Sequence, residues 1–156
     1  MRGVDAVILM GSKSDLEFSN RIAKVLEEFG VGYVMRIASA HKTPEKVLEI
    51  LREYDDAVFI TVAGRSNALS GFVDANTVNP VIACPPYSSK FSGMDILSSL
   101  RMPSGVAPLV VLEPENAALA AVKILAMKDR SLREKIRDYQ EKKKREVLEA
   151  DEEISC

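Results

Sequence analysis

The fold of this chain is decided by the stretch Val4-Asp5-Ala6-Val7-Ile8-Leu9-Met10-Gly11-Ser12-Lys13-Ser14-Asp15. Its first half is an almost continuous apolar run, which is typical of a strand buried on both faces of a parallel sheet. Ser14 or Asp15 can cap the start of a following helix, and Gly30 can end it. That helix is indicated by apolar side chains at helical spacing, namely Leu16, Ile22, Val25, Leu26 and Phe29. The first unit is therefore predicted to be strand, loop and helix.

Strand and helix signals then alternate along the chain. Residues 31–38 predict a second strand, and the helix after it has Thr43 at the N-cap, Pro44 at N1 and an end near Tyr54. Three more strands are predicted over residues 57–62, 80–83 and 106–112, with a short helix from Ala68 and an alanine-rich one from Pro114. This alternation predicts an α/β fold, a three-layer α/β/α arrangement around a doubly wound parallel sheet of about five strands in the flavodoxin-like order.

The whole chain, residues 1–156, is expected to form one domain, because its length suits a single core. From about residue 129 it is predicted to form an extra, highly charged helix that opens with a capping box at Ser131 and Glu134. The run Lys142-Lys143-Lys144-Arg145 is interpreted as a solvated helix face. The few apolar side chains of this helix could contact a neighbouring subunit: Leu132, Ile136, Tyr139, Val147 and Leu148.

Composition narrows the classes of function. With 47% hydrophobic and 28% charged residues, the chain resembles ordinary globular proteins. A net charge of -2 argues against a nucleic-acid partner, because no basic excess is present to neutralise a phosphate backbone. The apolar stretch before Gly11 is too short for a membrane span, and Cys84 and Cys156 cannot make a zinc site by themselves. A reduced, cytoplasmic protein without metal or membrane contact is expected.

The only histidine, His41, lies in the loop Ser39-Ala40-His41-Lys42-Thr43-Pro44 between the second strand and its helix. Histidine changes its charge near neutral pH, so this ring is a candidate general acid and base. In doubly wound sheets, ligands bind beyond the carboxyl ends of the strands, beside the first strand. The loops at Ser12, His41 and Gly64 are therefore expected to meet at one rim. The alternative is a surface histidine, or one satisfied by its neighbours.

The first two loops have the residue types that a sugar phosphate needs. The turn Gly11–Asp15 leads into a helix N-terminus, where free backbone N–H groups favour an anion. Ser39 and Lys42 add a hydroxyl and an ammonium group, which complement phosphate. Asp15 is an acceptor and suits ribose hydroxyls instead. The alternative for the first loop is a plain turn with a helix cap.

A third polar loop follows the strand over residues 57–62. Glycine at position 64 allows a ligand to approach the backbone, and Ser66 and Asn67 offer hydrogen-bond donors and acceptors. A polar loop with an asparagine cap explains the same letters. The loop Arg101–Gly105 could order a partner loop or bind ligand, and spacing does not decide between these roles.

Four motifs occur in order along the chain: Met10-Gly11-Ser12-Lys13-Ser14-Asp15, Ser39-Ala40-His41-Lys42-Thr43-Pro44, Ala63-Gly64-Arg65-Ser66-Asn67-Ala68-Leu69-Ser70-Gly71 and Ser98-Ser99-Leu100-Arg101-Met102-Pro103-Ser104-Gly105. Together they strongly resemble the aminoimidazole ribonucleotide carboxylase family of purine biosynthesis, from about Val4 to about Ala126. The resemblance implies a reversible carboxylation of a small ribonucleotide with carbon dioxide, without metal, biotin or other cofactor. It also implies a homo-oligomer, an octamer or a tetramer.

The resemblance also implies a role for each candidate site residue. His41 would be the general acid and base. Ser12, Ser39 and Lys42 would bind the phosphate, and Asp15 the ribose hydroxyls. Gly64 and Ser66 would line the imidazole and carboxylate end of the substrate.

The family has two branches with one fold, and this chain resembles the branch that uses carbon dioxide directly. The other branch, a mutase that rearranges the N-carboxy compound, has Ser-Ala-His-Arg in place of Ser39-Ala40-His41-Lys42. It also has a second histidine, within Ala-Gly-Gly-Ala-Ala-His in place of residues 63–68, and His41 is the only histidine here. The mutase remains the nearest alternative. A non-catalytic module that binds a flavin or nucleotide is a remote one.

Overall fold

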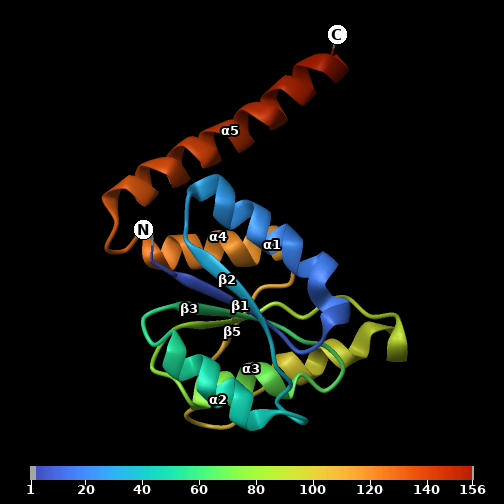
Figure 1. Cartoon of the computed structure of the whole chain (residues 1–156). Coiled ribbons are helices and arrows are strands. Elements are labelled where there is room, and N and C mark those ends of the chain that lie inside the picture. The colour runs from blue at the N-terminus through green and yellow to red at the C-terminus, as the bar shows by residue number, and fades with distance from the viewer. Residues whose placement is uncertain (1–2, 156) are drawn as a thin grey trace.

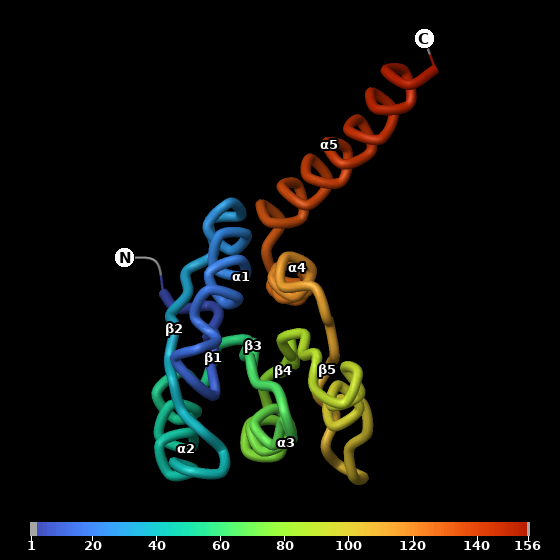
Figure 2. The backbone as a smooth tube through the Cα atoms, turned by 90° about the vertical axis from the view of Figure 1, so that its right-hand side faces the viewer, coloured from blue at the N-terminus to red at the C-terminus, as the bar shows by residue number. Residues whose placement is uncertain are grey.

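The computed structural model describes residues 3–155, which form a five-stranded parallel sheet with helices on both faces (Figure 1). The sheet has the order β2-β1-β3-β4-β5, and α1 and α4 cover one face while α2 and α3 cover the other (Figure 2). The three-layer, flavodoxin-like prediction is thus confirmed. The elements are β1 (Ala6–Met10), α1 (Leu16–Phe29), β2 (Tyr33–Ile37), α2 (Pro44–Glu53), β3 (Val58–Val62), α3 (Ala68–Ala75), β4 (Val81–Ala83), β5 (Leu109–Val110) and α4 (Pro114–Leu125).

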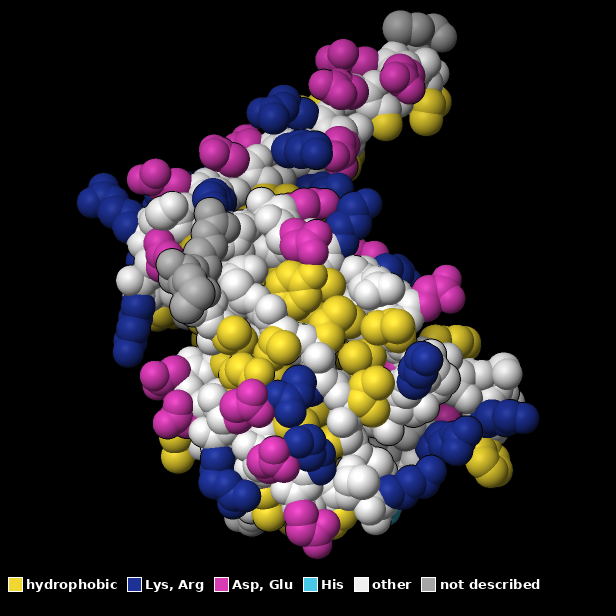
Figure 3. Space-filling view, viewed as in Figure 1, with side chains coloured by type: hydrophobic (Ala, Val, Ile, Leu, Met, Phe, Trp, Pro, Cys, Tyr) yellow, Lys and Arg dark blue, Asp and Glu magenta, His cyan; other side chains and the backbone are white. Residues whose placement is uncertain are grey.

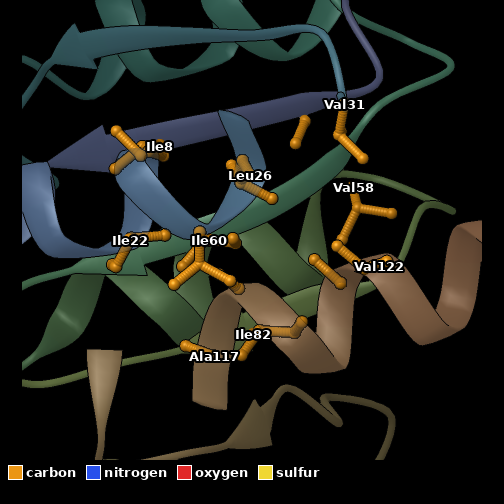
Figure 4. Close-up of a cluster of buried hydrophobic side chains, with 14 of the residues drawn as sticks. Ile8, Ile22, Leu26, Val31, Val58, Ile60, Ile82, Ala117 and Val122 are labelled. Carbon is orange, nitrogen blue, oxygen red and sulfur yellow. The ribbon is translucent and has the colours of Figure 1, made fainter. Parts of the chain in front are cut away.

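The apolar run of β1 is buried on both faces of the sheet, as its continuity predicted. All five of its residues are buried. Ile8 packs with Ile60 and Val122 in the cluster under α1 and α4 (Figure 4), whereas Val7 and Leu9 pack in the cluster under α2 and α3. Each fully buried side chain of this size contributes about 1.5–3 kcal/mol. The central strand therefore stabilises both helix layers.

The last predicted strand is much shorter than expected. Only Leu109 and Val110 form β5, in place of residues 106–112. β5 pairs only with β4, which has three residues. Pro108, directly before β5, has no N–H to donate to the sheet. The segment between β4 and β5 instead contains the 3-10 helix η2 (Lys90–Ser99), which is interrupted by left-handed residues at 91–93.

The charged C-terminal helix is present as α5 (Arg130–Ser155). Leu132 and Ile136 are buried against the core of the same chain, and the Tyr139 ring lies 5.4 Å from the Phe29 ring. The expectation of a neighbouring subunit is therefore wrong for these three residues. Val147 and Leu148 are 70% and 62% exposed, on the half of the helix that projects away from the sheet (Figure 2).

The predicted capping box at the start of α5 is also wrong. The backbone N–H of Leu132 donates to Asp129 Oδ1 (3.2 Å), so the cap comes from Asp129, two residues before Ser131. Glu134 instead lies 3.9 Å from Arg130 on the exposed surface. The solvated interpretation of residues 142–145 is confirmed, because all four are exposed.

Cys84 directly follows β4 and is fully buried, whereas Cys156 lies outside the described residues. The thiol of Cys84 is oriented toward the carbonyl oxygen of Leu112 (Sγ to O, 3.7 Å). Burial, together with the charge of Glu113, raises the pKa of this thiol to about 12. Among residues 3–155, no helix is both long and apolar enough to cross a bilayer.

Candidate active site

The first three strands of the chain, β1, β2 and β3, end at the same level. Met10 is paired with Ile37 on one side and with Val62 on the other, so the loops after β1, β2 and β3 begin side by side. β1 is also the strand where the chain changes direction across the sheet, which is where ligands bind in such folds. A cavity of about 460 Å³ lies there, and all seven predicted site residues line it: Ser12, Asp15, Ser39, His41, Lys42, Gly64 and Ser66.

The loop after β1 enters its helix through a short 3-10 turn, η1 (Lys13–Asp15). Ser12 caps this turn: its Oγ accepts from the backbone N–H of Ser14 (3.3 Å) and lies 3.0 Å from Ser14 Oγ. Asp15 precedes α1 but makes no capping bond with its side chain. Asp15 therefore occupies the predicted N-cap position, but its side chain does not supply the capping hydrogen bond. The Asp15 carboxylate is left for the cavity.

The environment of Asp15 disfavours its charge. Burial raises the pKa of this carboxyl above its usual value, while a hydrogen bond from the Ser12 backbone and the positive charge of Arg65 partly oppose the rise. A group with a raised pKa in the folded state destabilises that state when it is ionised; this cost shrinks as pH falls through the raised pKa and is gone only below the ordinary pKa of the unfolded chain. Asp15 is thus held in a position that costs stability, as functional carboxylates often are.

Replacing Asp15 with asparagine is expected to stabilise the unliganded chain at pH 7, because no charge is then buried. The advantage should shrink toward pH 3, where Asp15 itself becomes neutral. Urea denaturation at both pH values measures the effect. The exposed Asp138→Asn is the control and should change nothing. A less stable Asp15→Asn protein at pH 7 would contradict this account.

The loop after β2 is fastened at its base by Ser39 and Thr43. The N–H of Ser39 donates to Thr43 Oγ1 (2.9 Å), and the N–H of Thr43 donates to the Ser39 carbonyl (2.8 Å). Ser39 Oγ also accepts from the N–H of Lys42 (3.2 Å). α2 begins at Pro44, as predicted, although the Thr43 side chain caps the loop rather than the helix. The closed loop presents His41 and Lys42 at its exposed tip.

His41 is exposed and lines the cavity. None of the side-chain hydrogen bonds found among residues 3–155 uses its ring, so the alternative of a histidine satisfied by its neighbours is wrong, whereas the position of His41 at the surface is as that alternative expected. Lys42, next to it, forms no ion pair with any described residue. Both side chains remain available to a ligand in the cavity.

In the loop after β3, the backbone is open to the cavity at Gly64 and left-handed at Arg65 and Asn67. A Cβ at Gly64 would have only the Pro86 carbonyl oxygen within 4 Å, at 3.9 Å, so a ligand can approach there. Arg65 and Asn67 have φ of 59° and 27°, in the left-handed region that costs about 1–2 kcal/mol for a residue such as arginine and less for asparagine. Asn67 caps α3 through Oδ1, which accepts from the N–H of Ser70. Its role as the cap is confirmed, and its amide is used within the protein rather than offered to ligand.

Sequence reasoning missed one wall of the cavity. The segment after β4 contributes Tyr87, Ser88, Lys90 and Asp95. The available signal was the Pro- and Ser-rich loop that follows β4, because this loop leaves the same edge of the sheet. By contrast, no residue of the loop Arg101–Gly105 lines the cavity, so its considered role in ligand binding has no support.

The charges around the cavity are mixed, with three cationic side chains, Lys42, Arg65 and Lys90, and two acidic ones, Asp15 and Asp95. This set suits an anionic ligand that also carries hydroxyl groups. Within residues 3–155, no group of three His, Cys, Asp or Glu side chains is arranged to hold a metal ion. A doubly wound sheet with such a cavity and a free imidazole defines a class of α/β proteins with a site for small anionic molecules.

Comparison with known proteins narrows this class to one family. The family described as AIR carboxylase matches residues 5–146, and the chain belongs to it. It is 68% identical to the phosphoribosylaminoimidazole carboxylase of Archaeoglobus fulgidus over 97% of this chain and 86% of that protein. It is 44% identical to the N5-carboxyaminoimidazole ribonucleotide mutase of Methanocaldococcus jannaschii over 94% of this chain and 95% of that protein. The crystal structure of Treponema denticola PurE matches with a TM-score of 0.94 at 47% identity, covering 97% of this chain and 98% of that one.

Proposed function

We propose that the protein is a phosphoribosylaminoimidazole carboxylase of purine (IMP) biosynthesis. It adds carbon dioxide reversibly to 5-aminoimidazole ribonucleotide and gives 4-carboxy-5-aminoimidazole ribonucleotide. The observation that carries this proposal is that His41, the only histidine of the chain, lines the same cavity as Asp15 and Lys42. The 68% identity to a protein named phosphoribosylaminoimidazole carboxylase supports it. The active unit is a single domain over residues 1–156, working in the cytoplasm.

The substrate spans the cavity from one loop to the next. Its phosphate binds Ser12, Ser39 and Lys42, which supply two hydroxyls and a positive charge from the loops after β1 and β2. Asp15 accepts from the ribose hydroxyls. The imidazole ring then faces the open backbone at Gly64 and the Ser66 hydroxyl, beside His41. This orientation directs the reacting carbon toward the imidazole of the protein.

The chemistry needs one proton carrier. The enamine-like ring carbon attacks carbon dioxide, so that a carbon–carbon bond forms and the ring carbon becomes tetrahedral with both hydrogen and carboxylate attached. Neutral His41 removes the hydrogen as a proton, and the electron pair of the broken bond restores the aromatic ring. In reverse, protonated His41 gives the proton to the same carbon and carbon dioxide leaves. No step requires a metal or biotin.

Two features favour the carboxylase over the mutase. The resemblance assigns a second histidine to the mutase branch, and Ala68 stands at that position here. Two relatives named as carboxylases, at 68% and 48% identity, are more similar to this chain than the 44% identical relative named as a mutase. The mutase is the second candidate because its named relative still covers nearly the whole chain.

A substrate-choice assay tests the proposal. The protein is offered 5-aminoimidazole ribonucleotide with bicarbonate as the source of carbon dioxide, without ATP and with EDTA present, and separately the N-carboxy compound. Carboxylation in the first mixture is expected, with no consumption of the N-carboxy compound beyond its spontaneous breakdown. Preferred turnover of the N-carboxy compound would favour the mutase. Tight binding without turnover of either would favour the non-catalytic module.

We also propose that the chain works as a homo-oligomer, an octamer or a tetramer. Val147, Leu148 and Ile154 are exposed on the projecting half of α5. Figure 3 shows hydrophobic side chains gathered in the middle of the face on which β2, a strand at the edge of the sheet, lies. Exposed apolar surface of this kind marks interfaces. Light scattering is expected to give a multiple of the chain mass, and the mass of a single chain would contradict the proposal.

A further inference from the structure

The fourth sequence motif, residues 98–105, begins at the end of η2 with two adjacent serines, Ser98 and Ser99, whose role is not explained by the cavity. Ser99 is 1% exposed and Ser98 is half-buried. Neither lines the cavity. Buried polar side chains in native structures are nearly always hydrogen-bonded, so the hydrogen-bond partners of these two hydroxyls indicate their role.

Both serines bond to the loop after β3. Ser99 Oγ accepts from Asn67 Nδ2 at 2.6 Å. The single hydroxyl proton of Ser98 is shared between two carbonyl oxygens, that of Asp95 at 2.8 Å on its own helix and that of Arg65 at 3.0 Å. The two hydrogen bonds thus connect segments that are 32 and 33 residues apart in the sequence, and they hold the loop on either side of Ser66.

The residues that the serines hold are the two in the loop after β3 whose backbones are left-handed. Arg65 and Asn67 both have left-handed backbones, at φ of 59° and 27°. Such conformations persist in other residues than glycine only where the surroundings enforce them, and they cluster at functional sites. Asn67 is 4% exposed and is held from both sides, because its Oδ1 also accepts from the N–H of Ser70.

We propose that Ser98 and Ser99 are positioning residues for the carboxylation step. By enforcing the strained turn at 65–67, they keep Gly64 and Ser66 directed at the imidazole end of the substrate. This inference rests on the proposed function. The phosphate end is held by the loops at 11–15 and 39–43. Within residues 3–155, the side chains of these serines form no hydrogen bond with those loops, so their loss slows the chemical step and spares ribonucleotide binding.

Kinetics of serine-to-alanine variants test the proposal. Ser99→Ala is expected to lower kcat at least tenfold, while the KM for the ribonucleotide changes less than threefold. Ser98→Ala, at a less buried position, is expected to lower kcat at least threefold. Ser99→Thr keeps the hydroxyl and is expected to recover most of the rate. Ser104→Ala, an exposed serine in the next loop, is the matched control and should behave as the parent.

Amide hydrogen exchange gives a second readout that does not depend on activity. In Ser99→Ala, exchange is expected to rise over residues 64–67 and to stay unchanged over 11–15 and 39–43. A kcat within twofold of the parent, a rate loss equal to the loss of folded protein, or unchanged exchange over 64–67 would each overturn the proposal. A parent chain without turnover would refute the proposed function instead, and the exchange result would still decide whether the serines hold the loop.

Discussion

Replacing His41 with asparagine is expected to lower kcat by about a hundred- to ten-thousandfold, the usual contribution of general acid–base catalysis. Asparagine keeps a polar side chain of similar reach but cannot accept and return a proton near neutral pH. No other imidazole is available, because His41 is the only histidine in the chain. Steady-state carboxylation and decarboxylation rates measure the effect, and both directions should fall together.

Ribonucleotide binding is the control for this variant. Because His41 lies at the tip of its loop and makes no side-chain hydrogen bond with another described residue, its loss should leave the loop intact. Isothermal titration with 5-aminoimidazole ribonucleotide is expected to give a Kd close to that of the parent. Turnover within a few-fold of the parent would refute the assigned role.

Replacing Lys42 with alanine is expected to raise the KM for the ribonucleotide about ten- to a hundredfold, with a smaller effect on kcat. A hydrogen bond to a charged group is worth about 1.5–3 kcal/mol, which corresponds to that range of affinity. Lys42 lines the cavity, and its ammonium has no ion-pair partner among the described residues. It is therefore available to bind the phosphate, and alanine at this position removes that interaction.

Lys46→Ala is the matched control for Lys42. Lys46 lies on the adjoining helix α2 and is paired with Glu49 at 2.8 Å, outside the cavity lining. Its removal should leave both kinetic constants unchanged. An unchanged KM in Lys42→Ala would show that the ammonium does not bind phosphate, whereas a rise of the same size in both variants would point to a general effect of charge.

The layers of the fold could be predicted because each depends on a local pattern that burial reinforces. The continuous apolar run at 6–10 requires helices on both faces, and Gly30 and Pro44 mark where the neighbouring helices end and begin. The shortness of β5 was missed although the sequence carried signals of it, because the strand beside it was already predicted to be short, at residues 80–83, and Pro108 has no N–H to donate to the sheet. The cap of α5 was misjudged because Asp129 and Ser131 are both good caps, and docking of Leu132 and Ile136 on the core determines where the helix begins.

For the candidate site, the sequence predicted which loops meet but not how they are fastened. Parallel strands that end level bring Ser12, His41 and Gly64 together, which follows from topology alone. The left-handed backbone of Arg65 has no signal in the letters, because arginine usually avoids it. The bond from Asn67 to Ser99 joins residues 32 positions apart, and no periodic pattern reports such a contact.

The burial of Cys84 makes its sulfur a chemical reporter of core opening. Because burial raises the pKa of this thiol to about 12, it is almost entirely un-ionised at pH 7, and the thiolate is the form that reacts with alkylating agents. Reagents must also reach a side chain that is fully enclosed beneath the sheet. Modification therefore requires local unfolding that exposes the end of β4. Labelling rates then follow the free energy of this local unfolding rather than the reactivity of the sulfur.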